Sequence, residues 1–209
     1  MALPGMALRC RFVRPILALA AIASLAACAT PKVAPSGFLA SYDQLRPSEE
    51  TGAVRVQTSA ADRTSAYTAV LIEEATLIET RLSPQEAEAI RSALSEALAL
   101  ELARDRVIVV EPGAGALRVR YAIALVETSN VALNVLTTAL IGAVDYGSMA
   151  LEAEVLDSIT GERIAAMTWA RGAKLTNVLG AYSSTGNARA LAPEFARRLQ
   201  MLIAKDMPG

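Results

Sequence analysis

The residue with the most evident chemistry in this chain is Cys28, because a thiolate can act as a nucleophile and form a covalent bond. Before it lie three arginines with no acid, then an apolar run over residues 16–23, then small residues. This order is typical of a secretory signal peptide, and the run is shorter than the about 20 residues that a membrane span needs. We therefore expect residues 1–27 to be a signal peptide that is removed.

The residues just before the cysteine decide what happens to its thiol. They are Leu25, Ala26 and Ala27. With Cys28 they resemble the lipobox of bacterial lipoproteins. The resemblance implies that Cys28 becomes the N-terminus and carries a covalent diacylglyceryl group and an N-acyl chain. The alternative is an ordinary signal peptide cut after Ala27 or Ala29, which leaves Cys28 as a free thiol.

Acylation would make the protein membrane-anchored. A single acyl chain binds a membrane only marginally, so a stable anchor takes two or more. In lipoproteins of this kind, an aspartate after the cysteine favours retention in the inner membrane, and here that residue is Ala29. The resemblance therefore implies the outer membrane, with the protein on its periplasmic face.

Composition removes several classes of chemistry. The chain has no histidine, which excludes histidine-based triads, histidine zinc sites and imidazole proton relays. Cys10 leaves with the leader, so an acylated Cys28 has no disulfide partner. Losing the three leader arginines moves the formal charge from −1 to about −4, which gives no electrostatic reason to expect nucleic-acid binding. We predict no catalytic residues, no metal site and no cofactor beyond the covalent lipid.

Carboxylates are the other side chains that could do chemistry. Glu73 and Glu74 are adjacent in a predicted strand, so they should point to opposite faces and cannot form a catalytic pair. A second group of carboxylates lies in or beside a predicted hairpin, and its pattern fits either a cation site or a strand face exposed to solvent. It lacks the closely spaced oxygen ligands of a calcium loop, so we expect no metal there. Its members are Glu152, Glu154, Asp157 and Glu162.

The sequence also predicts two amphipathic helices, which should pack on the strands that carry these carboxylates. Ser83 can cap the first helix, with Pro84 at its first position and Glu86 completing a capping box. The apolar residues that follow at helical spacing are Ile90, Leu94, Leu98 and Leu102. The second helix is predicted over residues 193–205, and its apolar stripe consists of Phe195, Leu199 and Leu202.

Alternating apolar residues predict strands over 67–77, 106–110, 117–125, 149–157 and 163–169. Gly161 supplies a left-handed position in the link between the last two strands, which should form a central hairpin. Loops are expected over 46–64 and 171–187. The elements predict a two-layer α+β domain, in which two amphipathic helices cover a largely antiparallel sheet. The predicted organisation is a signal peptide (1–27), a lipidated tether (28–36) and a single domain (37–209).

Two segments carry a resemblance to a known family. A Ser-Gly-Phe-Leu-x-x-Tyr-x-x-Leu segment begins at Ser36, and its apolar residues recur at helical spacing and could dock on the core. A Leu-Glu-Ala-Glu segment begins at Leu151, and an Asp-Ser-x-Thr-Gly-Glu segment begins at Asp157. Together with the lipobox they resemble the bacterial lipoproteins of the Domain of Unknown Function 3313 family. The resemblance implies a location and no activity.

Residues 131–144 form an apolar stretch with no charge over fourteen positions. The stretch is too short to span a bilayer. It could pack into the core of the domain, or it could be exposed and contact a second copy, a partner or the membrane surface. The candidate interaction residues are Val131, Leu133, Val135, Leu136, Leu140 and Ile141.

These features predict an outer-membrane-anchored periplasmic lipoprotein that acts as a non-enzymatic interaction or assembly module of the cell envelope. Its expected partners are the membrane, through the lipid, and an envelope protein or a second copy. One alternative is a protein that binds a lipid or a small apolar ligand, which needs an apolar cavity between helices and sheet. The other is a carboxylate-dependent envelope hydrolase, which needs two carboxylates that converge in a cleft.

Overall fold

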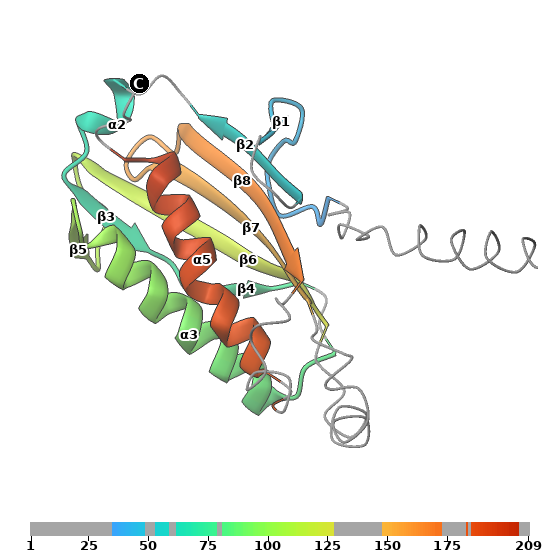
Figure 1. Ribbon diagram of the computed structural model, residues 1–209. Coiled ribbons are helices and arrows are strands. Elements are labelled where there is room, and N and C mark those ends of the chain that lie inside the picture. The colour runs from blue at the N-terminus through green and yellow to red at the C-terminus, as the bar shows by residue number, and fades with distance from the viewer. Residues whose placement is uncertain are drawn as a thin grey trace, which may run out of the picture. The chain divides into compact units, whose positions relative to one another are not determined.

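The computed structural model describes residues 35–48, 53–58, 62–78, 81–127, 148–172, 183 and 185–204 (Figure 1). These residues all belong to one compact unit, Pro31–Gly209. The predicted signal peptide, Cys28 and the apolar stretch 131–144 lie outside the described residues. No helix within the described ranges is both long and apolar enough to cross a membrane.

Within those ranges, eight strands form one sheet, in the order β1-β2-β8-β7-β6-β3-β5, with β4 paired to β6. The predicted hairpin of β7 and β8 is central, and the predicted left-handed turn is present, with Gly161 at φ +72°. The strands are β1 (Arg46–Pro47), β2 (Ala53–Thr58), β3 (Ala69–Ile72), β4 (Thr76–Leu77), β5 (Val107–Val109), β6 (Ala116–Glu127), β7 (Ser148–Asp157) and β8 (Arg163–Gly172).

The sheet is mixed. Strands β1, β2, β8, β7 and β6 pair antiparallel along the sheet, whereas β3 pairs parallel with β5 and β6, and β4 pairs parallel with β6. The parallel part arises because helix α3 (Pro84–Leu102) carries the chain back between β3 and β5, and such a crossover lets two strands run in the same direction. The α+β prediction is therefore confirmed, and the parallel edge was not predicted.

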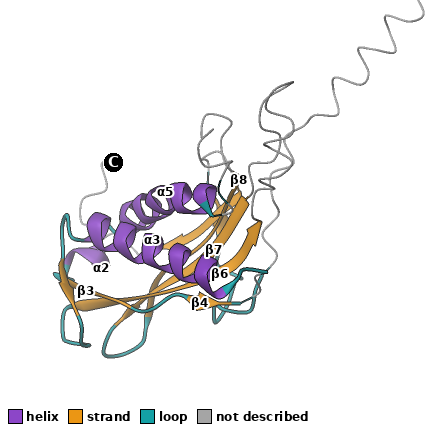
Figure 2. Cartoon of the chain, turned by 90° about the horizontal axis from the view of Figure 1, so that it is seen from below, coloured by secondary structure: helices purple, strands orange, loops and turns teal. Residues whose placement is uncertain are grey.

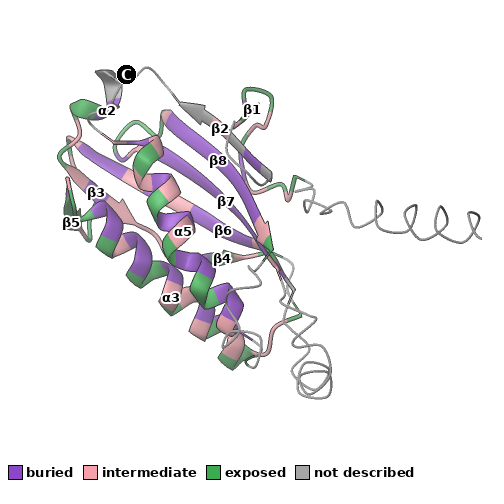
Figure 3. Ribbon diagram, viewed as in Figure 1, coloured by how far each residue is buried: buried purple, intermediate pink, exposed green. Residues whose placement is uncertain are grey.

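Helices α3 and α5 (Gly186–Leu202) cover one face of the sheet, which we call the inner face (Figure 2). The core lies between them and the sheet, where the strand centres are buried (Figure 3). Trp169 of β8 meets Phe195 of α5 edge to face, with ring centroids 5.8 Å apart. Both side chains are at most 1% exposed, so they form the centre of this layer.

The start of α3 confirms the predicted capping box. The Ser83 hydroxyl accepts the backbone N–H of Glu86 at 3.3 Å, and the Ser83 backbone N–H donates to Glu86 Oε2 at 2.9 Å.

Replacing Ser83 by alanine should lower the free energy of unfolding by about 1 kcal/mol, because an N–H group at the helix end loses its acceptor. Urea denaturation measures this change. Ser95→Ala, at an exposed position inside the same helix, is the control and should cause no loss.

Three predicted boundaries are wrong. Residues 46–64 are not all loop, since they include β1, β2 and the short helix α2 (Asp62–Ser65). The strand predicted over 67–77 is interrupted after Ile72 and resumes as β4. Helix α5 begins at Gly186, and Pro193 lies inside it. The buried residues Ala188, Leu191 and Ala192 pack this first part of α5 on the core, and that packing outweighs the poor helix propensity of proline.

Candidate functional site

Two glutamates lie in the middle of the central strand, on the face opposite the helices, which we call the outer face. Because side chains alternate along a strand, Leu151 and Ala153 enter the helix-covered core, while Glu152 and Glu154 point the other way. Glu152 is 0% exposed and Glu154 is 2% exposed. Acidic side chains are rarely buried unless hydrogen-bond donors or cations pair with them. The groups that cover these two glutamates must therefore supply such partners.

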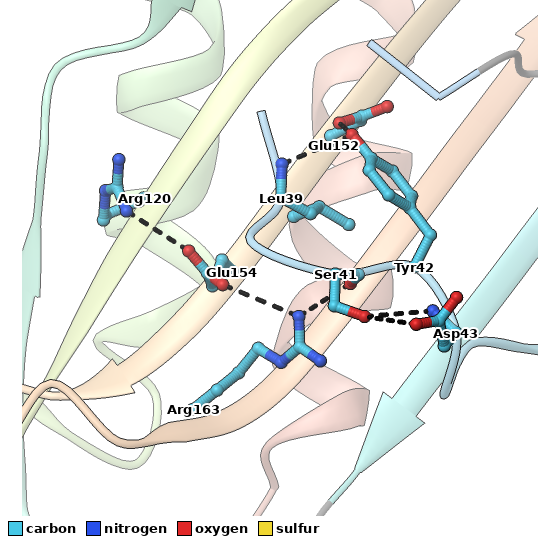
Figure 4. A network of polar contacts seen from close by, with 8 residues as sticks. All are labelled: Leu39, Ser41, Tyr42, Asp43, Arg120, Glu152, Glu154 and Arg163. Atoms are coloured by element: carbon cyan, nitrogen blue, oxygen red, sulfur yellow. Dashed lines mark hydrogen bonds and ion pairs between the residues drawn. The ribbon is translucent and has the colours of Figure 1, made fainter. Parts of the chain in front are cut away.

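The cover over Glu152 is residues 35–45, which we call the strap (Figure 4). Glu152 Oε1 accepts the backbone N–H of Ser36 at 3.0 Å. Glu152 Oε2 accepts the Ser36 hydroxyl at 2.7 Å and the Tyr42 hydroxyl at 2.6 Å. The buried carboxylate therefore receives three hydrogen bonds, all from a segment more than 100 positions earlier in the chain.

The strap docks on the sheet without forming a helix. Gly37 has φ +86°, a conformation that few residues other than glycine adopt. The Tyr42 hydroxyl accepts the backbone N–H groups of Gly37 and Leu39 at 3.0 and 3.3 Å. Leu39 and Leu45 are buried against Ala166 of β8. The expectation that these apolar residues dock is confirmed, although their helical spacing has no helical counterpart.

Glu154 reaches the strap through two arginines. It lies 3.2 Å from Arg120 Nη1 and 3.8 Å from Arg163 Nη1. Arg163 also donates to the backbone carbonyl of Ser41 at 2.7 Å, and the Arg120 guanidinium stacks over the Phe38 ring, 5.3 Å from its centroid. Cation–π and charge-assisted contacts of this kind are stronger where water is excluded. Glu152 therefore binds the strap directly, and Glu154 is linked to it through the two arginines.

The structure does not gather the four predicted acidic residues into one site. Glu152 and Glu154 have the separate partners given above, Glu162 is exposed, and Asp157 binds the hairpin turn. Among the described residues, no group of three or more potential metal ligands occurs. Glu73 contacts Arg118 and Arg120, whereas Glu74 contacts Arg91, so the adjacent pair reaches different partners.

Asp157 makes stability depend on pH. Its carboxylate accepts the backbone N–H groups of Thr160 and Ile159 and the Tyr67 hydroxyl, at 2.7, 2.9 and 2.9 Å. These bonds favour the charged form, and they lower the pKa of Asp157 from 3.8 to about 2. Because the folded pKa is the lower one, this stabilisation is complete above the unfolded value and is lost as the pH falls through the folded value.

We therefore expect Asp157→Asn to be less stable than the wild type above about pH 4, with the difference shrinking towards zero as the pH falls to about 2. Urea denaturation of both proteins between pH 2 and pH 6 measures it. A difference that is the same at every pH would contradict the assigned role of the carboxylate charge.

Two of the segments that suggested a family resemblance meet in this network. The segment that begins at Ser36 supplies the strap, and the segment that begins at Leu151 supplies both glutamates. Both segments are evident in the sequence, whereas their contact is visible only in the structure. The available signal was the pair of acids at alternate positions of an otherwise apolar strand, which predicts two charges on a face that something must cover.

Comparison with solved structures finds similarities at low identity. The PelC dodecamer from Paraburkholderia phytofirmans has 10% identity and a TM-score of 0.48, covering 74% of this chain and 98% of that one. A Xanthomonas campestris protein of the DUF330 family has 12% identity and a TM-score of 0.39, with coverages of 64% and 84%. A Caulobacter crescentus protein, described provisionally as a lipoprotein, has 16% identity and a TM-score of 0.32, with coverages of 69% and 91%. Because these TM-scores are below 0.5, the similarities give no basis for inferring a function.

Comparison with protein families is more specific. A search of the curated proteins finds no match. The model of the family described as "Protein of unknown function (DUF3313)" matches residues 34–199. This range includes the strap, both buried glutamates and most of α5, and it covers more than half of the chain. The protein therefore belongs to the DUF3313 family.

Proposed function

We propose that this protein is a lipid-anchored module of the outer membrane, on its periplasmic face, which acts by binding rather than by catalysis. The observation that carries the proposal is the strap, because it begins within the last two residues of the predicted tether (28–36) and is bonded to the centre of the sheet. Eight residue steps separate Cys28 from Ser36, so this link spans at most about 28 Å. A lipid on Cys28 would thus hold the outer face close to the membrane.

The contacts of the buried glutamates support binding over catalysis. A general acid or base must exchange a proton with a substrate within hydrogen-bond reach. Both oxygens of Glu152 accept hydrogen bonds from the strap, and Glu154 lies between two arginines. The strap would have to leave before a substrate could reach either carboxylate. This pair therefore gives no support to an envelope hydrolase.

The alternative of a lipid-binding or small-ligand-binding protein needs an apolar cavity between helices and sheet. In the described core this interface holds large side chains that are at most 1% exposed, among them Leu98, Trp169 and Phe195. Close packing of this kind leaves little room for a ligand. The packing therefore favours the interaction module.

Residues 128–147, which include the candidate interaction residues, connect β6 to β7 in the sequence. Glu127 and Ser148 are direct partners across β6 and β7, and residues 128–147 connect them. Neighbouring antiparallel strands can be joined by two to five residues, and longer connections are often functional. The length of this connection supports a role of 131–144 in contacting a partner.

Photo-crosslinking in cells tests the proposal. Probes at Val135 and Leu140 should capture a discrete envelope protein or a second copy, whereas a probe at the exposed Glu111 should not. The product should disappear in a Cys28→Ala variant, since that protein lacks the anchor. If neither probe gives a product, and Leu136→Asp merely unfolds the monomer, the interaction role of this stretch is wrong.

A further inference from the structure

A second polar site lies beside helix α3. A pocket of about 400 Å³ opens between helix α3 and the link that joins β3 to β4. The link contributes Glu73 and Glu74, and α3 contributes Glu88 and Glu96. This volume falls within the range of small-molecule sites, about 300–1,000 Å³. The pocket thus combines a suitable size with acids on two walls.

The pocket contains more negative than positive charge. Glu88, Ser92 and Glu96 are spaced four residues apart, so they lie along one stripe of α3. The Ser92 hydroxyl donates to Glu96 Oε1 at 2.9 Å, which leaves the charge of Glu96 in place. Arg91 is the cation among the lining residues, and it is shared between Glu74 at 3.4 Å and Glu88 at 3.9 Å. The lining therefore favours a positively charged ligand.

A buried phenol supplies an independent observation. Tyr121 of β6 lines the pocket, is 1% exposed, and has no hydrogen bond from its hydroxyl to any described residue. Burial, together with the charge of Glu74, raises the pKa of Tyr121 to about 12, although Arg91 opposes the shift. The hydroxyl is therefore neutral at physiological pH and can accept or donate a hydrogen bond. A ligand in the pocket can therefore form a hydrogen bond with this hydroxyl.

We propose that this pocket binds an ammonium group, with Glu74, Glu96 and the Tyr121 hydroxyl as its acceptors. An ammonium group offers three N–H donors, and charge-assisted bonds to carboxylates are the strong class of hydrogen bond. A polyamine or a lysine side chain of a partner protein can supply it. The inference does not depend on the lipid anchor or on the strap.

Calorimetry on the mature full-length protein in detergent tests the pocket, with spermidine and a tri-lysine peptide as probes. Glu96→Gln should weaken binding about tenfold, because a charged acceptor becomes a neutral amide of the same size. Tyr121→Phe should weaken binding several-fold without lowering the thermal stability, because only an unpartnered hydroxyl is removed. Glu111→Gln, an exposed acid outside the pocket, is the control and should bind as the wild type does.

The two probes distinguish the sources of the ammonium group. Tighter binding of spermidine assigns the pocket to small amines, and tighter binding of the peptide assigns it to a partner's lysine. The inference is wrong if neither probe binds at low ionic strength. It is also wrong if Glu96→Gln and Tyr121→Phe bind both probes as tightly as Glu111→Gln does.

Discussion

Glu152→Ala should lower the free energy of unfolding by about 3 kcal/mol and detach the strap from the sheet. The variant removes the acceptor of three hydrogen bonds, so the Ser36 N–H, the Ser36 hydroxyl and the Tyr42 hydroxyl lose their partner. A buried polar group that has lost its hydrogen-bond partner is still removed from water, and this uncompensated desolvation destabilises the folded state. Urea denaturation gives the loss of stability, and amide hydrogen exchange over residues 36–39 reports on the strap.

Two variants make this result specific. Glu111→Ala removes an acid from an exposed turn and should change stability by less than about 0.5 kcal/mol. Tyr42→Phe removes one of the three donors, so its effect should be smaller than that of Glu152→Ala. If amide exchange over 36–39 is as fast in the wild type as in Glu152→Ala, the strap is not bound as described.

Phe195→Ala should lower the free energy of unfolding by about 3–5 kcal/mol, the largest effect that we expect for a single substitution. The Phe195 ring is 0% exposed and packs edge to face on Trp169, between α5 and the sheet. Its loss removes buried apolar area and leaves a cavity that the surrounding layer cannot fill. Trp169 is the only tryptophan in the chain, so its fluorescence follows the unfolding transition directly.

Leu100→Ala provides the comparison on α3. Leu100 is 70% exposed, so its truncation should change stability by less than about 0.5 kcal/mol. Similar losses for Phe195→Ala and Leu100→Ala would show that the helix layer is not packed as described.

The sequence predicted the parts of the fold that local patterns control. The capping box at Ser83 placed the start of α3 at the correct residue, because the cap depends on side chains only three positions apart. Gly161 was placed correctly because its turn is also local. Strand β2 was missed because its pairing with β8, across more than 100 residues, determines that it is a strand.

The candidate site was harder to predict for the same reason. Glu152 and Glu154 were identified, but their burial depends on a segment that the chain contributes more than 100 residues earlier. The strap's apolar residues show helical spacing, and only the structure shows that Gly37 and the Tyr42 hydroxyl hold them in an irregular conformation. Periodicity reports on local structure, whereas this site is made by contacts between distant segments.

We propose that a lipid on Cys28 joins this domain to the outer membrane. Intact-mass spectrometry of the protein from separated membrane fractions tests it most directly, with Cys28→Ala as the control. We predict an N-terminus at Cys28, a mass increase equal to a diacylglyceryl group and an N-acyl chain, and recovery in the outer-membrane fraction. An unmodified chain beginning at Cys28 or Thr30, recovered with the soluble periplasmic proteins, would contradict the account.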